Sequence, residues 1–319
     1  MAIELPDLLA YRATYQSEGI EWPLKTVPQV KGGLLTQLPS SAGNKTGWPH
    51  NEQVDPELYR EKAHWPKLTI VTPSYQQAEF LERTIRSVLL QNYPNLEYII
   101  IDGGSTDGSV AVIQKYAPWL SFWESTGDRG QGHAINKGFS LASGNYYGWI
   151  NSDDYYLSMA FCKVLSTFQQ TRAAFVYGYA LNFIEEEKRF GKPSIMEPLL
   201  DYFIRIPALA QPACFWCESI HQPLWEALHC ALDYELWLRM VKGNKRKLIR
   251  QPLAVAVQHN EAKTHNPDVK AKWEQDHLLI CDESAYGSVP TWNRIIFLYR
   301  LRSKIYKWFR LNENDWYNH

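Results

Sequence analysis

Short apolar segments alternate with amphipathic ones from Lys67 onward, and this alternation restricts the possible folds more than any other feature of the chain. Four segments are typical of buried strands: KLTIVTPSY (67–75), LEYIIID (96–102), LSFWES (120–125) and YYGWIN (146–151). Segments with helical spacing of apolar residues follow the first three, at 78–91, 109–116 and 134–142. Strands that alternate with helices predict an α/β fold whose central sheet is mostly parallel and flanked by helices.

The rest of the chain divides around this region. Residues 1–66 are predicted to form a partly irregular N-terminal extension, because 31–57 are rich in Gly, Pro, Ser and Asn and lack sustained periodicity. Trp48 is a candidate anchor for this extension on the main domain, which we place at 67–264, and residues 265–319 form a C-terminal helical segment. Within the main domain we further predict a strand at 175–181, an amphipathic helix at 233–241 and a strand–turn–strand unit at 248–259.

Composition excludes some classes of function. The chain has 319 residues and a net charge of −1, and nucleic-acid binding normally needs a basic surface. The N-terminal MAIELPDLLAYRATYQSEG lacks the apolar core of a signal peptide, and no uncharged apolar run reaches the roughly 18 residues of a transmembrane helix. We therefore expect a cytoplasmic protein.

The C-terminal stretch WNRIIFLYRLRSKIYKWFR (292–310) mixes aromatic and aliphatic residues with Arg and Lys and contains no acid. Such a segment is typical of a helix at an anionic membrane surface, which would place the protein at the inner face of the cell membrane. It is equally typical of a closing helix that packs on the core with an exposed basic face.

The five cysteines are scattered and odd in number, which argues against a disulfide framework. Cys214 and Cys217 have CxxC spacing, but the two residues between them are aromatic and no second CxxC follows. We expect buried or incidental thiols rather than a metal or redox site.

Polar clusters end three of the predicted strands: TPSY, DGGSTD and NSDD. Because ligands bind beyond the carboxyl ends of parallel strands, we expect these clusters to face one crevice. The adjacent acids Asp153 and Asp154 repel each other unless a positive group lies near them. Mg²⁺ typically takes one or two carboxylates plus substrate phosphates, so this pair favours a metal site over a helix cap with an exposed neighbour.

Four other polar residues each allow a functional and a structural interpretation. Asp102 suits a base- or ribose-binding carboxylate or a capped strand-to-helix turn, and Arg129 suits a phosphate contact or a surface pair with Asp128. Asp233 at a helix start is either a general base or a cap. His259 is either a ligand or a structural residue. Taken singly, each residue type favours the structural alternative.

Four blocks taken together closely resemble the family 2 glycosyltransferases of bacterial polysaccharide and glycolipid biosynthesis. They are TPSYQQAEFLERTIRSVLLQNYPNLEYIIIDGGSTDGS, DRGQGHAINKGFSLASGNYYGWINSDDYY, QPACFW and LDYELWLRM. The resemblance implies a GT-A catalytic domain at 67–264, a UDP-, GDP- or dTDP-linked sugar donor, and Mn²⁺ or Mg²⁺. It also implies transfer, with inversion, to a hydroxyl of a saccharide or lipid-linked acceptor.

Carried over by position, the resemblance implies roles for individual residues. The nucleotide-contacting loop is Thr72, Pro73, Ser74 and Tyr75, and the base pocket is Asp102, Gly104 and Ser105. The diphosphate and donor sugar are covered by Arg129, Gly130, Gln131 and Asn136. In the DxD region, Asn151 to Asp154, the resemblance implies that Asp153 contacts the ribose or donor sugar and that Asp154 binds the metal. Asp233 is the base, Gln211 and Pro212 lie near the acceptor, and His259 with Lys263 and Thr264 closes on the diphosphate or metal.

Three positions depart from the family pattern. Asn151 replaces the usual first acid of DxD, Leu232 precedes Asp233 where Glu is common, and Cys217 stands where a basic residue is common. The alternatives are a catalytically silent sugar-nucleotide-binding subunit and a sugar nucleotidyltransferase. Retention of Asp154 and Asp233 argues against the first, and TPSYQQ is not the glycine-rich, basic loop that the second requires. The sequence does not identify the base, donor sugar or acceptor.

Overall fold

The computed structural model describes residues 4–60, 64–191, 209–241, 243–259 and 267–282, together with Leu301, Lys304 and Trp308. The predicted roles of Lys263 and Thr264 lie outside these residues, as does all of 292–310 apart from the last three named. Within the described part of the chain, no helix is both long and apolar enough to span a bilayer.

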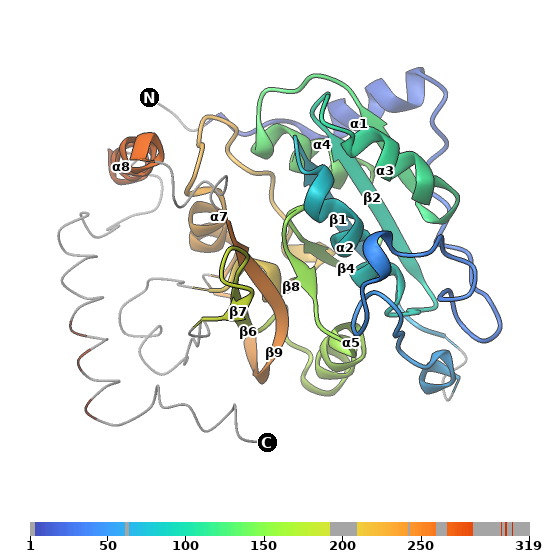
Figure 1. Ribbon diagram of the computed structural model, residues 1–319. Helices are drawn as coiled ribbons and strands as arrows, with labels where there is room; N and C mark the ends of the chain where they lie inside the picture. The colour runs from blue at the N-terminus through green and yellow to red at the C-terminus, as the bar shows by residue number, and fades with distance from the viewer. Residues whose placement is uncertain are drawn as a thin grey trace.

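A nine-stranded sheet forms the centre of the molecule, in the order β3-β2-β1-β4-β8-β6-β9-β5, with β7 paired to β6 (Figure 1). The strands are β1 (Leu68–Ser74), β2 (Leu96–Asp102), β3 (Phe122–Ser125), β4 (Tyr146–Trp149), β5 (Tyr155–Tyr156), β6 (Phe175–Ile184), β7 (Arg189–Phe190), β8 (Cys214–Cys217) and β9 (Arg246–Gln258). The run β3-β2-β1-β4 is parallel, as predicted, and β8 is antiparallel to both β4 and β6.

Helices cover both faces of this sheet. They are α1 (Leu8–Ser17), α2 (Ala78–Leu89), α3 (Ser109–Tyr116), α4 (Gln131–Leu141), α5 (Ala160–Thr171), α7 (Leu232–Met240) and α8 (Pro267–Asp282). Short 3₁₀ turns lie at Ala42–Asn44, Pro56–Tyr59, Ala117–Trp119, Gln211–Ala213 and Glu218–Ile220.

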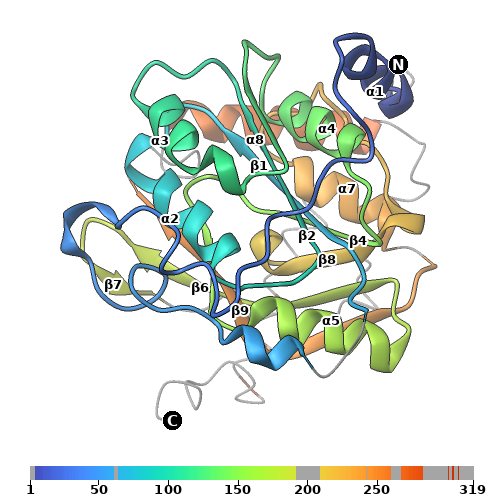
Figure 2. The same ribbon diagram turned by 90° about the vertical axis from the view of Figure 1, so that its right-hand side faces the viewer.

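Successive residues of a strand point to opposite faces, and the two hydrophobic cores follow this alternation. Ile70 and Ile100 pack on one face with α2, α3 and α5. Val71 and Ile101 pack on the other face with α4 and α7. Figure 2 shows α2 and α3 on one side of β1 and β2, and α1, α4 and α7 on the other.

The predicted strand–turn–strand unit at 248–259 is wrong, because β9 is one continuous strand parallel to β6. Pro252, which suggested the turn, pairs with Tyr179 at a register shift between the two strands. A bulge of this kind tolerates a residue that has no N–H to donate, so the proline interrupts the ladder without ending the strand.

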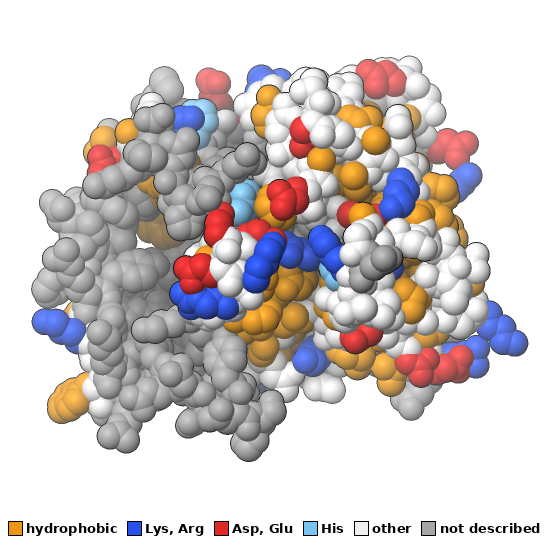
Figure 3. All heavy atoms as spheres, in the orientation of Figure 1, with side chains coloured by type: hydrophobic (Ala, Val, Ile, Leu, Met, Phe, Trp, Pro, Cys, Tyr) orange, Lys and Arg blue, Asp and Glu red, His pale blue; other side chains and the backbone are white. Residues whose placement is uncertain are grey.

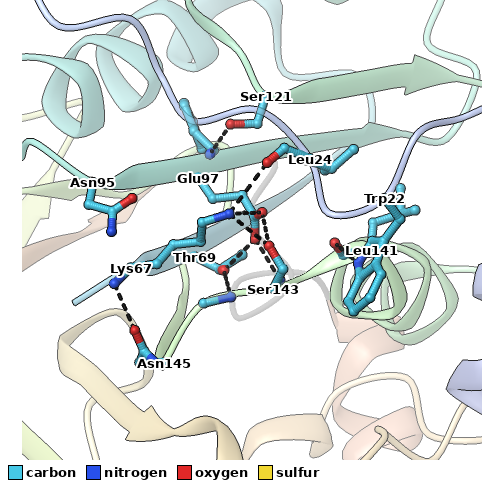
Figure 4. A network of polar contacts seen from close by, with 12 residues as sticks. Trp22, Leu24, Lys67, Thr69, Asn95, Glu97, Ser121, Leu141, Ser143 and Asn145 are labelled. Atoms are coloured by element: carbon cyan, nitrogen blue, oxygen red, sulfur yellow. Dashed lines mark hydrogen bonds and ion pairs between the residues drawn. The ribbon is translucent and has the colours of Figure 1, made fainter.

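A buried carboxylate joins the amino ends of the strands (Figure 4). Glu97 on β2 accepts hydrogen bonds from Thr69 Oγ1 (2.6 Å) and from the Ser143 backbone N–H (2.7 Å), and it pairs with Lys67 Nζ (3.3 Å). A buried charge is tolerated when it is paired and fully hydrogen-bonded. The network therefore fixes β1, β2 and the approach to β4 relative to one another, far from their carboxyl ends.

The N-terminal extension packs on this domain through polar anchors. Trp48 donates from its indole nitrogen to the Tyr156 carbonyl at 2.7 Å, in keeping with its predicted anchoring role. The buried Arg86 of α2 donates to the carbonyls of Pro39 (2.7 Å), Pro49 (3.0 Å) and His50 (2.6 Å). One guanidinium thus satisfies carbonyls of a loop that has little secondary structure of its own.

The surface carries both signs of charge. Figure 3 shows Lys and Arg side chains interspersed with Asp and Glu across the middle of one face, with no large field of a single sign. This agrees with the net charge of −1.

We predict that Arg86→Met lowers the free energy of unfolding by about 3 kcal/mol, because the carbonyls of Pro39, Pro49 and His50, which are buried or partly buried, lose their donor. Chemical denaturation measures this loss. The control is Arg60→Ala, which removes an exposed arginine paired with Glu57 and should change stability by less than about 0.5 kcal/mol. Equal stability of the two variants would contradict an anchoring role for Arg86.

Candidate active site

A pocket of about 750 Å³ opens at the carboxyl ends of β1, β2 and β4. Its walls combine the three strand-end clusters with the loop before α4 and with the ends of β6 and β9. The lining residues are Pro73, Ser74, Tyr75, Gln77, Gly103, Gly127, Asp128, Gly130, Gln131, Ala134, Asn151, Ser152, Asp153, Asp154, Asn182, Ala256, Val257 and Gln258. The structure thus brings TPSY, DGGSTD and NSDD to one crevice.

The TPSY segment contributes three of its four residues to the pocket. Tyr75 is 61% exposed there, and Ser74 is buried with a hydroxyl that has no hydrogen-bond partner within the described chain. Thr72 instead lies in the core, with its hydroxyl 3.2 Å from the hydroxyl of Tyr98. An exposed aromatic ring beside a buried, unused hydroxyl suits a flat polar ligand such as a nucleobase.

The Asp102 carboxylate stabilises the DGGSTD turn through hydrogen bonds to the residues that follow it. Its carboxylate accepts from the Ser105 N–H (2.8 Å), the Ser105 hydroxyl (2.6 Å), the Gly104 N–H (3.1 Å) and the Ser125 hydroxyl (2.7 Å), and the residue is fully buried. Gly104 has φ +82°, a left-handed conformation that favours glycine. Of this turn, Gly103 is the residue that lines the pocket, while Asp102, Gly104 and Ser105 shape it from behind.

The loop before α4 divides between two surfaces. Gly130 and Gln131 line the main pocket, whereas the Arg129 guanidinium, 63% exposed, donates to Glu226 (2.6 Å) and to the Tyr11 hydroxyl (2.7 Å). Arg129 therefore does not form the predicted surface pair with Asp128, and it is not among the residues that line the main pocket.

Asn136 is also turned away from the pocket. The residue is buried, and its amide nitrogen donates to the Leu224 carbonyl (2.9 Å) and to Glu226 (3.0 Å), while its amide oxygen accepts from the Leu224 N–H (2.8 Å). Asn136 and Glu226 thus fasten the 224–226 segment to α4.

The substitution of Asn for the first acid of DxD has a local reason. The Asn151 amide oxygen accepts from the Gln131 amide and the Trp149 indole, both at 2.8 Å. Its amide nitrogen is then available to Asp154, and this hydrogen bond opposes the rise in the pKa of that carboxyl, which burial causes. An amide can donate and accept at once, whereas an ionised carboxylate only accepts.

Asp154 is built into the wall of the site. Its Oδ1 accepts from the Val257 N–H at 2.9 Å, and its own carbonyl accepts from the Thr84 hydroxyl at 2.6 Å. Burial, followed by the charge of Asp153, raises the pKa of Asp154 well above its ordinary value. Burial and the neighbouring acid thus both disfavour the ionised form of Asp154.

Asp153 presents its carboxylate to the pocket. The side chain is 22% exposed, and its Oδ2 lies 3.3 Å from Nε2 of the buried His259. The His259 ring in turn packs on Phe80, with 4.4 Å between ring centroids. Of the two adjacent acids, Asp153 is thus the one placed to meet a ligand, and His259 stands beside it.

Asp233 lies in the first turn of α7. Burial raises its pKa to about 6, although hydrogen bonds from the N–H groups of Tyr234 and of Asp233 itself oppose the shift. Its charge also raises the pKa of Cys214, for which burial is the larger cause. Asp233 is not among the residues that line the main pocket.

The predicted acceptor-side residues lie next to the end of β4. Gln211 donates from its amide to the Trp149 carbonyl at 2.8 Å, and Pro212 is buried in the following 3₁₀ turn. The four described cysteines, Cys162, Cys214, Cys217 and Cys230, are free thiols.

Sequence reasoning missed one wall of the pocket. Asn182 of β6 and Gln258 of β9 line it, together with Gln77 at the start of α2. Isolated amide residues in strands carry no motif, and the parallel pairing of β6 with β9, which aligns Ile184 with Gln258, joins segments about 70 residues apart. Only the long-range pairing shows that they meet.

A sheet with a parallel β3-β2-β1-β4 run, covered by helices on both faces and carrying an acid-lined pocket at its strand ends, is a GT-A domain. Residues 69–220 match the family model described as glycosyl transferase family 2. These residues, just under half of the chain, are similar to that family, as the sequence resemblance implied.

Curated relatives point to the same similarity. The putative teichuronic acid biosynthesis glycosyltransferase TuaG of Bacillus subtilis is 33% identical over 122 residues, which are 36% of this chain and 48% of TuaG. An uncharacterized glycosyltransferase of Nostoc sp. is 30% identical over 155 residues, 47% of this chain and 48% of that protein. The chain spans between 34% and 61% of the length of the first curated relatives it matches.

Solved structures share the fold. S. aureus TarS in complex with UDP-GlcNAc has a TM-score of 0.57 at 15% identity, over 76% of this chain and 73% of that one. The mannosyltransferase PcManGT of Pyrobaculum calidifontis, in complex with GDP-Man and Mn²⁺, has a TM-score of 0.50 at 15% identity, over 96% and 94% of the two chains. At such low identity the likeness shows the fold alone.

We predict that Asn151→Asp destabilises the protein at pH 7 by about 1–3 kcal/mol, because it replaces a donor to Asp154 with a third acid. Denaturant unfolding measures the effect. The control is Asn51→Asp, which makes the same chemical change at an exposed asparagine whose oxygen accepts from the Gly47 N–H at 2.6 Å. Equal stability of the two variants would show that the Asn151 amide does not support Asp154.

Proposed function

We propose that the chain is a metal-dependent, inverting glycosyltransferase that moves a sugar from a nucleoside-diphosphate donor to an acceptor hydroxyl. The observation that carries this proposal is the contact of Asp153, which lines the pocket together with the exposed Tyr75, with the buried His259 behind it. The match of residues 69–220 to the family 2 glycosyl transferase model and the nucleotide-sugar ligands in the names of the two structural neighbours support it.

The charges of the pocket favour a cation. Three carboxylates line it, those of Asp128, Asp153 and Asp154, and no Lys or Arg does so within the described residues. A diphosphate entering such a site meets repulsion unless positive charge accompanies it. Mn²⁺ or Mg²⁺, when bound, would supply that charge and act as a Lewis acid on the diphosphate oxygens.

The side chains of the pocket can bind such an ion if the protein supplies only one or two of its ligands. The described residues contain no group of three His, Cys, Asp or Glu arranged to hold a metal. Mg²⁺ commonly takes one or two protein carboxylates and completes its coordination with phosphate oxygens and water. We propose Asp153 and His259 as the protein ligands, with Asp154 as the residue that orients Asp153. This reverses the roles that family resemblance implied for the two acids.

Asp233 is proposed as the general base. It accepts the proton of the acceptor hydroxyl as that oxygen attacks the anomeric carbon and the bond to the diphosphate breaks. Attack from the face opposite the leaving group inverts the anomeric centre. A base with a pKa of about 6 is ionised at neutral pH and still basic enough to assist the attack. The acceptor proposed is a saccharide or lipid-linked saccharide.

We predict that donor binding requires the metal and Asp153. One of the UDP-, GDP- and dTDP-sugars should stabilise the wild-type protein in a thermal-shift assay with Mn²⁺ or Mg²⁺, by about 2.7 kcal/mol at a hundredfold excess over Kd. Asp153→Asn should lose the metal-dependent part of this stabilisation. Asp128→Asn removes another carboxylate from the same pocket and should keep it. A metal-dependent shift that survives in Asp153→Asn would refute the assignment.

A second prediction concerns Asp233 and pH. Because a base must be ionised, transfer should lose rate as pH falls through about 6 and reach a plateau above it. Asp233→Asn should retain donor binding and lose about 10²–10⁴-fold in kcat.

Stability supplies the control for that variant. The raised pKa means that ionised Asp233 costs stability above pH 6, so Asp233→Asn should unfold at the same or a higher denaturant concentration at pH 7. Transfer by Asp233→Asn at the wild-type rate would exclude Asp233 as the base. Binding of donor without any turnover by the wild-type protein would instead indicate a silent subunit.

A further inference from the structure

The segment that leads into α7 is held by a carboxylate from a distant helix. Asp276 of α8 accepts hydrogen bonds from three consecutive backbone N–H groups, those of His229 (3.0 Å), Cys230 (2.6 Å) and Ala231 (2.9 Å). Asp276 is fully buried. A buried carboxylate needs such donors, and consecutive backbone N–H groups form a recognised anion-binding arrangement.

The N-cap position of α7 has no capping side chain of its own. Ala231 occupies the N-cap position and has no side chain that can accept a hydrogen bond. Ser, Thr, Asp or Asn normally fills this position and satisfies a free N–H of the first turn. Here the carboxylate comes from 45 residues further along the chain and binds the N-cap N–H itself.

The face of α8 that contacts the α7 region is buried, and its opposite face is exposed. Asp276 and Ile280, four residues apart and on one side of the helix, are both fully buried, and Ile280 belongs to the same hydrophobic core as Leu232 and Leu236. Lys272, Glu274 and Leu278 are exposed. Figures 1 and 2 both show α8 alongside the α7 region.

We propose that Asp276 is a positioning residue, which fixes the backbone at 229–231 and thereby sets the place of Asp233 two residues later. This inference rests on the proposed function, in which Asp233 is the base. The Asp233 carboxylate accepts hydrogen bonds from N–H groups of the first turn of α7. The position of that turn, and therefore of the carboxylate, depends on the backbone that precedes it. A displacement of about 1 Å in a catalytic group can cost a hundredfold in rate.

The test compares Asp276→Ala, Asp276→Asn and Glu274→Ala with the wild-type enzyme. Glu274→Ala removes an equal charge from the exposed side of the same helix and serves as the matched control. Calorimetry with UDP, GDP and dTDP in the presence of Mn²⁺ gives the number of binding-competent sites. Transfer assays at saturating donor give kcat per competent site and the KM for the donor.

Asp276→Ala should keep the wild-type donor KM and lose about 10- to 100-fold in kcat per competent site. Asp276→Asn, which retains an acceptor oxygen, should lose less, and Glu274→Ala should match the wild type. If Asp276→Ala lowers the number of competent sites but not kcat per site, Asp276 is merely structural and the inference is wrong. If the wild-type protein catalyses no transfer, the proposed function itself fails, and this inference with it.

Discussion

The hydrogen bond from the Val257 backbone to the Asp154 carboxylate joins the two halves of the sheet at the point where the site forms. Asp154 follows β4, in the parallel half, whereas Val257 lies near the end of β9, in the half beyond β8. The Thr84 hydroxyl of α2 binds the Asp154 carbonyl, so a helix from the first face also reaches this residue. Burying a carboxylate here is costly, and these contacts keep the cost tolerable. Without this hydrogen bond, the pocket wall formed by Asn182 and Gln258 would no longer be tied to the acids that follow β4.

The position of Asp153 follows from this arrangement. With Asp154 fixed in the wall, its neighbour has to point the other way, into the pocket and towards His259. The adjacent acids therefore differ in their surroundings, because Asp154 is buried and hydrogen-bonded to Val257 whereas Asp153 is partly exposed. Asn151 supports this arrangement. Its amide oxygen accepts hydrogen bonds from Gln131 and Trp149, and its amide group is hydrogen-bonded to Asp154.

The predictions from sequence were most accurate where periodicity and motifs are local. The strands β1 to β4 and the helices between them lie close to their expected positions, because apolar spacing reports which face of an element is buried. Side-chain direction was beyond such reasoning. Asp102, Arg129 and Asn136 sit in the expected segments, yet their partners are Ser105, Glu226 and Leu224. Glu226 and Leu224 come from a stretch without motifs, and no spacing rule identifies them.

The N-terminal extension has a consequence for synthesis in the cell. Trp48 emerges from the ribosome 108 residues before Tyr156, whose carbonyl it binds. At a translation rate of about 5–20 residues per second, that interval lasts about 5–20 s. During this time the extension has no completed surface to pack on, although its apolar residues Leu34, Leu38 and Val54 are already exposed to solvent. Its many Gly, Pro, Ser and Asn residues keep such a segment from forming stable strands of its own before the surface around Tyr156 has been synthesised.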